Sequence, residues 1–194
     1  MTALFMVGCS ANEEADSSKE SEITEEAETG ETQSESDNRH TSHQKGLKIG
    51  ETGTVVSGTI NDNRSYEITL NSVEYRDIVA GLEASEDTYA VVNITVTNTD
   101  DSAFNAKDIY GPAFGAEGEL TATLNPVLFD HQDKVEEDIL EEILEGEIAP
   151  GEEITGIHVF DIKQNDVYVF TIGGSGAQII TYAQWEVSDS EIEQ

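Results

Sequence analysis

Hydrophobic and polar residues alternate along most of the chain beyond residue 46. The clearest run covers residues 88–98, where every second position is apolar: Ala90, Val92, Ile94 and Val96. The same period of two recurs around residues 66–75, 154–162, 168–172 and 179–187, in segments rich in Val, Ile, Thr, Tyr and Phe. Such runs are typical of half-buried strands. Within the run of residues 66–75 the alternation shifts by one position at Asn71-Ser72, which predicts a β-bulge.

Turn residues separate these runs. Pro150-Gly151 suits the central positions of a type II turn, and residues 61–63 and 98–101 are loop signals. Residues 173–176 (Gly-Gly-Ser-Gly) predict a hairpin turn that links two adjacent strands. Seven or eight short strands at this spacing favour an all-β fold, an antiparallel β-sandwich.

One segment has a helical period instead. Apolar residues recur every three or four positions from 133 to 144: Val135, Ile139, Leu140, Ile143 and Leu144. Acidic residues occupy the opposite face, among them Glu136, Glu137, Glu141 and Glu142. This pattern predicts one short amphipathic helix between strands, with an exposed acidic face.

The N-terminal residues carry a different signal. The single cysteine, Cys9, closes the apolar run of residues 3–7, and an acidic, Ser/Thr-rich segment follows it at once. This arrangement resembles the lipobox of bacterial lipoproteins, which implies a mature chain that begins at Cys9 and carries a diacylglyceryl group on its thiol. A secretory signal has roughly 15–30 residues, so the resemblance makes residues 1–9 a truncated signal peptide with a translation start upstream of Met1.

Residues 10–45 differ in composition from the rest. They contain eleven acidic residues, three basic ones and eleven Ser or Thr, with Ile23 as the one large aliphatic residue. Such a segment cannot bury enough apolar surface to offset its ordering entropy, so we expect a disordered tether. The remaining 149 residues, 46–194, then form one domain.

The charge is extreme. Of the formal net charge of −32, −24 falls on residues 46–194, so the predicted domain is itself strongly acidic. Phosphate backbones repel such a surface, which excludes nucleic-acid binding. The charge also suits surroundings of high salt, where screening is strong.

Three segments carry a further resemblance: Gly50–Val55, Tyr89–Asn98 and Gly146–Phe160. Together they resemble the immunoglobulin-like domain of unknown function found in Gram-positive lipoproteins, a family akin in fold to telokin and the mycobacterial immunoprotective extracellular protein. The likeness spans about residues 50–187. It implies an immunoglobulin-like sandwich and an extracytoplasmic location on the outer face of the cell membrane, and it transfers no catalytic residues.

Candidate chemistry is sparse. A lone cysteine provides no Cys-based zinc site, redox pair or thiol nucleophile within the domain. His158 lies on a strand among apolar neighbours and is expected to be a satisfied core histidine, since no second histidine has ligand spacing. The strand pattern leaves no room for a deep apolar pocket with convergent titratable groups, so a small hydrolase is the weaker alternative.

Loop carboxylates leave one metal possibility open. Asp62, Asp100 and Asp101 stand in loops and could offer calcium oxygen ligands. No other cofactor is expected. The sequence therefore predicts a membrane-anchored lipoprotein whose acidic domain is a non-catalytic binding or structural module with an unknown protein or cell-envelope ligand. The alternative is a calcium-dependent adhesion or sensing module.

Overall fold

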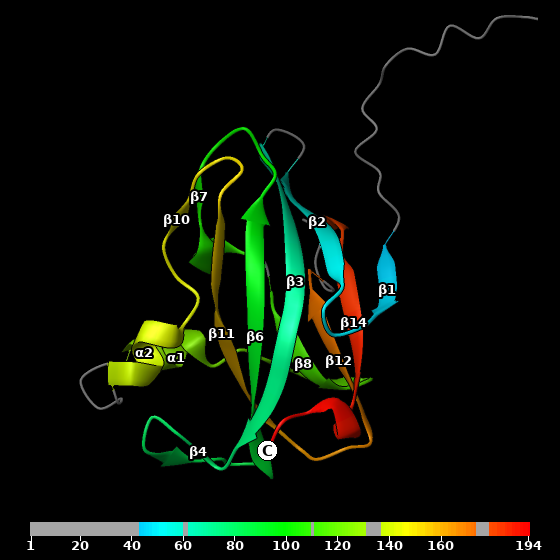
Figure 1. Ribbon diagram of the computed structural model, residues 1–194, viewed down its shortest axis with the longest axis vertical. Coiled ribbons are helices and arrows are strands. Elements are labelled where there is room, and N and C mark those ends of the chain that lie inside the picture. Colours follow the sequence, from blue (N-terminus) through cyan, green and yellow to red (C-terminus); the bar gives the residue numbers. More distant parts are fainter. Residues whose placement is uncertain (1–42, 60–61, 110, 131–136, 174–178) are drawn as a thin grey trace, which may run out of the picture. The chain divides into compact units, whose positions relative to one another are not determined.

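The computed structural model describes residues 43–59, 62–109, 111–130, 137–173 and 179–194 (Figure 1). The strands of the first half are β1 (Gln44–Leu47), β2 (Thr52–Thr59), β3 (Asp62–Arg76), β4 (Ile78–Val79), β5 (Leu82–Glu83), β6 (Thr88–Asn98) and β7 (Phe104–Asn105). Those of the second half are β8 (Ala113–Ala116), β9 (Glu119–Ala122), β10 (Glu147–Ile148), β11 (Glu153–Ile162), β12 (Val167–Ile172), β13 (Ile179–Thr181) and β14 (Ala183–Ser188). The helical segments are α1 (Asn125–Asp130), α2 (Glu137–Glu142) and two 3₁₀ turns, η1 (Ala106–Asp108) and η2 (Asp189–Glu191).

Two five-stranded sheets form the body of the fold. One has the order β1-β14-β12-β8-β9 and the other β11-β6-β3-β2-β13. The prediction of an all-β sandwich is therefore confirmed. Its antiparallel description needs one correction, because β1 runs parallel to β14, while every other pairing between these strands is antiparallel. β1 begins at Gln44, two residues before the predicted domain boundary.

Two local predictions are confirmed. The register of β3 against β6 shifts between Leu70 and Ser72, where the phase slip predicted a bulge. At Pro150-Gly151, the amide of Glu152 donates to the carbonyl of Ala149 at 2.9 Å and Gly151 has a φ of 77°. A positive φ at the third position of a type II turn favours glycine, which explains why one stands here.

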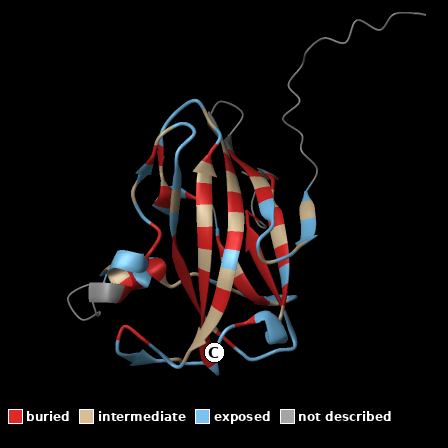
Figure 2. Cartoon of the chain, viewed as in Figure 1, coloured by how far each residue is buried: buried red, intermediate tan, exposed pale blue. Residues whose placement is uncertain are grey.

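The main core lies between the two sheets. Its largest fully buried side chains are aromatic: Trp185, Tyr66, Tyr168, Phe114, Phe160 and Phe170. Buried and partly exposed residues alternate in bands along β3 and β6 (Figure 2), as expected for strands with one face in the core. Burial of these large side chains is the main stabilising contribution, about 1.5–3 kcal/mol each.

A second apolar cluster covers the outer face of the β11–β6 end of its sheet. Val91, Ile157 and Val159 contribute from the strands, and Leu128, Ile139 and Ile143 from α1, α2 and the residue that follows α2. The two helices lie beside β11 (Figure 1). Because this end of the sheet is covered on both faces, residues 156–160 are all buried and do not alternate.

The run of residues 179–187 is not one strand. β13 pairs with β2 in one sheet, whereas β14 pairs with β12 in the other, and Tyr182 stands between them. The chain therefore changes sheets here while its period of two continues. The prediction that residues 173–176 form a hairpin between adjacent strands is wrong, since the next strand along the chain, β13, pairs with β2 and not with β12.

The helical prediction is corrected in part. Residues 133–136 of the predicted helix lie outside the described residues. Of residues 137–144, Glu137–Glu142 are helical. Ile143 and Leu144 leave the helix to meet β11, where the amide of Leu144 donates to the carbonyl of Ile157 at 3.2 Å. Gly156 permits this approach, because a Cβ there would lie 2.6 Å from the Cα of Leu144. A second short helix, α1, was not predicted.

Candidate functional site

The predicted lipid anchor and most of the tether, including Cys9, lie outside the described residues, as do His131 and Glu136. The lipidation of Cys9 therefore stays a prediction. Asp62 opens β3, but its side chain is also outside the description. In the part of the chain that the structure describes, no helix is long and apolar enough to cross a membrane.

The Asp100-Asp101 loop has a structural role. The Asp100 carboxylate accepts hydrogen bonds from the amides of Ser65 at 3.0 Å and Asp101 at 2.8 Å. Partial burial raises the pKa of Asp100, but these bonds outweigh it and hold the pKa below its ordinary value. Among the described residues, no three His, Cys, Asp or Glu side chains are grouped to hold a metal. Calcium binding by this loop stays a prediction.

The acidic face of α2 is exposed where the structure describes it. Glu141 and Glu142 both face solvent. A carboxylate oxygen of Glu142 lies 3.7 Å from a guanidinium nitrogen of Arg76, so one of these charges is paired with β3. An exposed pair of this kind contributes little to stability.

A cavity of about 490 Å³ opens at the edge of the sandwich beside β11. We call it the His158 cavity. Its apolar lining comes from several segments: Ile109 and Pro112 precede β8, Ala122 ends β9, and Pro126 and Phe129 belong to α1. Leu144 and His158 close it toward β11, and Lys107 and Asp108 complete the charged part of its lining. The expectation that no deep apolar pocket with convergent titratable groups would form is corrected only in part, because titratable side chains do belong to the lining of this mostly apolar cavity, but the Nε2 atom of His158 is covered.

Asn125, in the lining of this cavity, attaches the β9–α1 segment to β11, next to the point where Leu144 meets the same strand. Its side-chain oxygen accepts from the amide of Val159 at 3.1 Å, and its Nδ2 donates to the carbonyl of Ile157 at 2.9 Å. The side chain thus takes the place of a neighbouring strand for two backbone groups of β11. Asn125 is 5% exposed, so losing these bonds would leave the amide of Val159 unpaired, whereas the carbonyl of Ile157 would still accept from the amide of Leu144.

The side-chain amide of Asn125 also determines which tautomer His158 adopts. Since one Nδ2 hydrogen of Asn125 is donated to Ile157, the other faces Nδ1 of His158 at 3.0 Å. Nδ1 must therefore accept, and the ring proton of the neutral form sits on Nε2. Burial lowers the pKa of His158 to about 4, so the ring is neutral at physiological pH.

The Nε2 proton of His158 has no acceptor among the residues that the structure describes. The ring is 5% exposed, and Nε2 itself is covered. The expectation of a fully satisfied core histidine is thus confirmed for Nδ1 and wrong for Nε2. A buried donor without a partner costs about 1–3 kcal/mol, which makes this atom the most unusual polar group of the site.

Sequence reasoning missed this site because its walls come from four separate segments. Two signals were nevertheless present. Asn125-Pro126 followed by Val127-Leu128 has a proline where a helix begins, which is its favoured helical position. The unbroken apolar run of residues 156–160 around His158 is typical of a strand covered on both faces.

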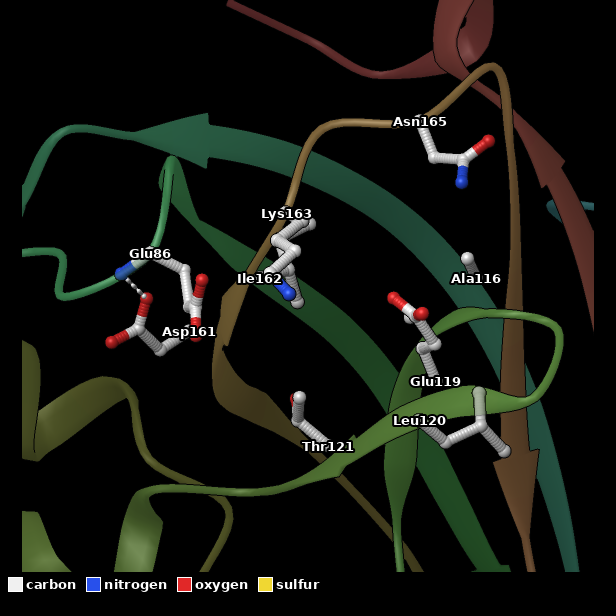
Figure 3. A pocket seen from close by; sticks show the side chains of 10 residues that line it. Glu86, Ala116, Glu119, Leu120, Thr121, Asp161, Ile162, Lys163 and Asn165 are labelled. Atoms are coloured by element: carbon white, nitrogen blue, oxygen red, sulfur yellow. Dashed lines mark hydrogen bonds between the residues drawn. The ribbon is translucent and has the colours of Figure 1, made fainter.

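A second pocket, of about 300 Å³, lies at the other end of β9 (Figure 3). Glu86 and Asp161 stand on one side of it and Glu119 and Leu120 of β9 on the other. The Asp161 carboxylate accepts from the amides of Ser85 and Glu86, each at 2.9 Å, so it anchors the turn before β6. Because the partly buried carboxylate of Asp161 is already hydrogen-bonded and Glu86 and Glu119 are exposed, this pocket offers less specific chemistry than the His158 cavity.

Comparison with known proteins identifies the family. A family model described as a domain of unknown function (DUF4352) matches residues 46–176. The chain belongs to this family. The DUF4352 match begins in β1 and extends past the end of β12, so it includes Asn125, His158 and the whole His158 cavity. It confirms the resemblance to a domain of unknown function.

Several solved structures resemble the DUF4352 chain at low identity. The yjhA protein of Bacillus subtilis is 17% identical, with 65% of this chain and 79% of that chain covered and a TM-score of 0.39. The ycdA protein of Bacillus subtilis, described as a "putative lipoprotein", is 15% identical, with 72% and 40% covered and a TM-score of 0.45. MPT63, a secreted protein of Mycobacterium tuberculosis, is 14% identical, with 76% and 100% covered and a TM-score of 0.51.

The MPT63 likeness, at this identity, supports the fold alone. No curated protein matches the chain.

Proposed function

We propose that this DUF4352 protein is an extracytoplasmic lipoprotein, held on the outer face of the cell membrane through Cys9, whose domain is a non-catalytic binding module. Residues 10–45 serve as the tether between anchor and domain. With 36 residues, this segment spans ~30–36 Å on average as a flexible coil, and more under like-charge repulsion.

The position of Cys9 supports the anchor. It follows an apolar run and precedes a polar, acidic segment, as the modified cysteine of a lipoprotein does. Two acyl chains hold a protein stably at a membrane where one does not, since each buried CH₂ contributes about 0.8 kcal/mol. A diacylglyceryl group therefore suffices without a basic patch, and a chain with a net charge of −32 has none to offer.

The His158 cavity is the observation that carries the binding function. It combines a mostly apolar lining with a few polar side chains, among them His158, whose tautomer is fixed by Asn125, and this is the usual composition of a ligand site. Its chemistry disfavours catalysis. The Thr123 hydroxyl lies 3.2 Å from His158 Nδ1, but a base with a pKa of about 4 abstracts protons poorly at neutral pH.

Mass spectrometry of the membrane-extracted protein tests the anchor. We expect a mature chain that begins at Cys9 with the mass of a diacylglyceryl group. Cys9→Ser should release the protein from the membrane fraction, and Ser10→Ala is the matched control that should remain there. An unmodified Cys9 thiol on an intact chain in the cytoplasm would refute the proposed location.

A turnover assay tests the non-catalytic assignment. If Thr123 and His158 formed a nucleophile and base, the wild-type protein would hydrolyse p-nitrophenyl acetate and Thr123→Val would abolish this activity. We expect the two proteins to show the same background rate. A faster rate in the wild type that is lost in Thr123→Val would favour the hydrolase alternative.

A further inference from the structure

The His158 cavity has the size of a small-molecule site. Its volume of about 490 Å³ falls within the range of roughly 300–1,000 Å³ that such sites occupy. Ile109, Pro112, Phe129 and Leu144 give it apolar walls. A ligand with an apolar body would therefore remove much of its own surface and that of the walls from water.

The polar groups of the cavity define what else the ligand carries. Nδ1 of His158 already accepts from Asn125, so the ring offers the Nε2 proton alone, and a ligand must supply an acceptor. The cavity lining includes one cation, Lys107, and one anion, Asp108, which lies 3.6 Å from Arg64. The lining charges thus balance, and the net charge of −24 on residues 46–194 disfavours an anionic ligand.

We propose that the His158 cavity binds an uncharged small molecule that has an apolar body and a carbonyl-type oxygen, and that this oxygen accepts the Nε2 proton of His158. This inference rests on the proposed binding function and names its ligand class. The bond would satisfy the one buried side-chain donor that the described part of the domain leaves unpaired.

Binding requires a local adjustment. Because Nε2 is covered, an acceptor in the cavity reaches it only after a local rearrangement around His158. Pro126 and Phe129 belong to α1, a helix of six residues, and Phe129 is only partly buried. Ligand contact should therefore perturb the resonances of α1 as well as those of His158.

A pair of probes of matched shape tests the proposal. Acetophenone carries a carbonyl oxygen on an apolar body, and ethylbenzene has nearly the same body without the acceptor. Both are titrated into the full ¹⁵N-labelled chain and followed by NMR. We expect saturable shifts at His158, at the Asn125 side-chain amide and along α1. Acetophenone should bind about fivefold more tightly, the ratio that one ordinary net hydrogen bond produces.

Two variants assign the effect to the cavity. His158→Leu removes the donor, so the preference for acetophenone should vanish. Ala122→Phe obstructs the cavity from an exposed position and should weaken both probes without unfolding the domain. Leu120→Phe, on the same strand but at the other pocket, is the matched control and should bind like the wild type.

Several results would overturn the proposal. They are equal binding of the two probes by the wild type, shifts confined to other surfaces, and unchanged binding in Ala122→Phe. Equal binding would mean that a water molecule, or no partner, serves Nε2. None of these results bears on the state of Cys9, so a failure here is distinguishable from a failure of the lipoprotein assignment.

Discussion

Acidification should destabilise the domain through His158. In the folded protein burial lowers the pKa of this ring to about 4, against an ordinary value of 6.5. The unfolded chain therefore binds a proton at a pH where the folded chain does not. The stability that the neutral ring contributes is fully present above pH 6.5 and is lost as the pH falls toward 4.

The two pKa values set the size of the effect. Between pH 8 and pH 5, a single site with these values lowers the free energy of unfolding by about 2 kcal/mol. The loss approaches about 3 kcal/mol once the pH is below both values. Solvent screens this site only slightly, since the His158 side chain is 5% exposed.

Urea unfolding of the full chain at pH 5 and pH 8 measures this loss. Trp185 is the one tryptophan of the sequence and is fully buried, so its fluorescence reports unfolding of the domain. Protonation of carboxylates also changes stability over this range, so the wild type must be compared with a variant. His158→Asn retains a side-chain acceptor for Asn125 but does not titrate, and it should lose about 2 kcal/mol less than the wild type on acidification.

His43→Asn is the matched control. His43 is exposed and stacks on Tyr182 with 4.1 Å between ring centroids, so the variant loses a histidine without changing a buried site. It should retain the wild-type pH dependence. If the wild type and His158→Asn lose equal stability between pH 8 and pH 5, His158 is not held neutral by the fold and the argument for a fixed Nε2 proton fails.

Four further predictions concern charge, packing, the Asp100 loop and calcium. The melting temperature should rise between about 0.01 and 1 M NaCl, because the Debye length falls from ~30 to ~3 Å and screens the repulsion among the acidic side chains; a melting temperature indifferent to salt would contradict this. Gly156→Ala should lower the free energy of unfolding by about 1–3 kcal/mol in urea denaturation, because the new Cβ would clash with the backbone of Leu144. An unchanged urea midpoint would show that the Leu144 backbone moves away without cost. Asp100→Ala should lower stability by about 1 kcal/mol through the lost bonds to Ser65 and Asp101. Calorimetric titration of the wild type with calcium tests the ion alternative separately, since saturable binding at millimolar or tighter affinity, lost in Asp100→Asn/Asp101→Asn, would favour it.

The sequence predicts best the elements whose two faces differ. β3 with its bulge and β6 follow from a period of two because one face of each is polar over much of its length, whereas β11 alternates only near its two ends. The Pro150-Gly151 turn follows from the conformations of its two residues. These features are local, so the residues that specify them stand close together in the chain.

The features that the sequence did not predict depend on distant segments. The change of sheet at Tyr182 leaves the alternation of residues 179–187 intact, so periodicity alone cannot reveal it. The parallel pairing of β1 depends on β14, which lies some 140 residues later in the chain. The His158 cavity needs Asn125 to meet β11, and no pattern within either segment encodes that meeting.

The parallel pairing of β1 with β14 has a mechanical consequence. β1 is the first strand of the domain and follows the proposed tether, while β14 is the last. Because the strands run the same way, a pull on the chain before Gln44 and an opposite pull beyond Ser188 would slide them past each other. Their hydrogen bonds and the Lys48–Glu186 ion pair at 2.8 Å would then be strained together, and not one after another as in a peeled hairpin. A protein fixed to a cell surface at one end and loaded at the other would resist extension best in this geometry.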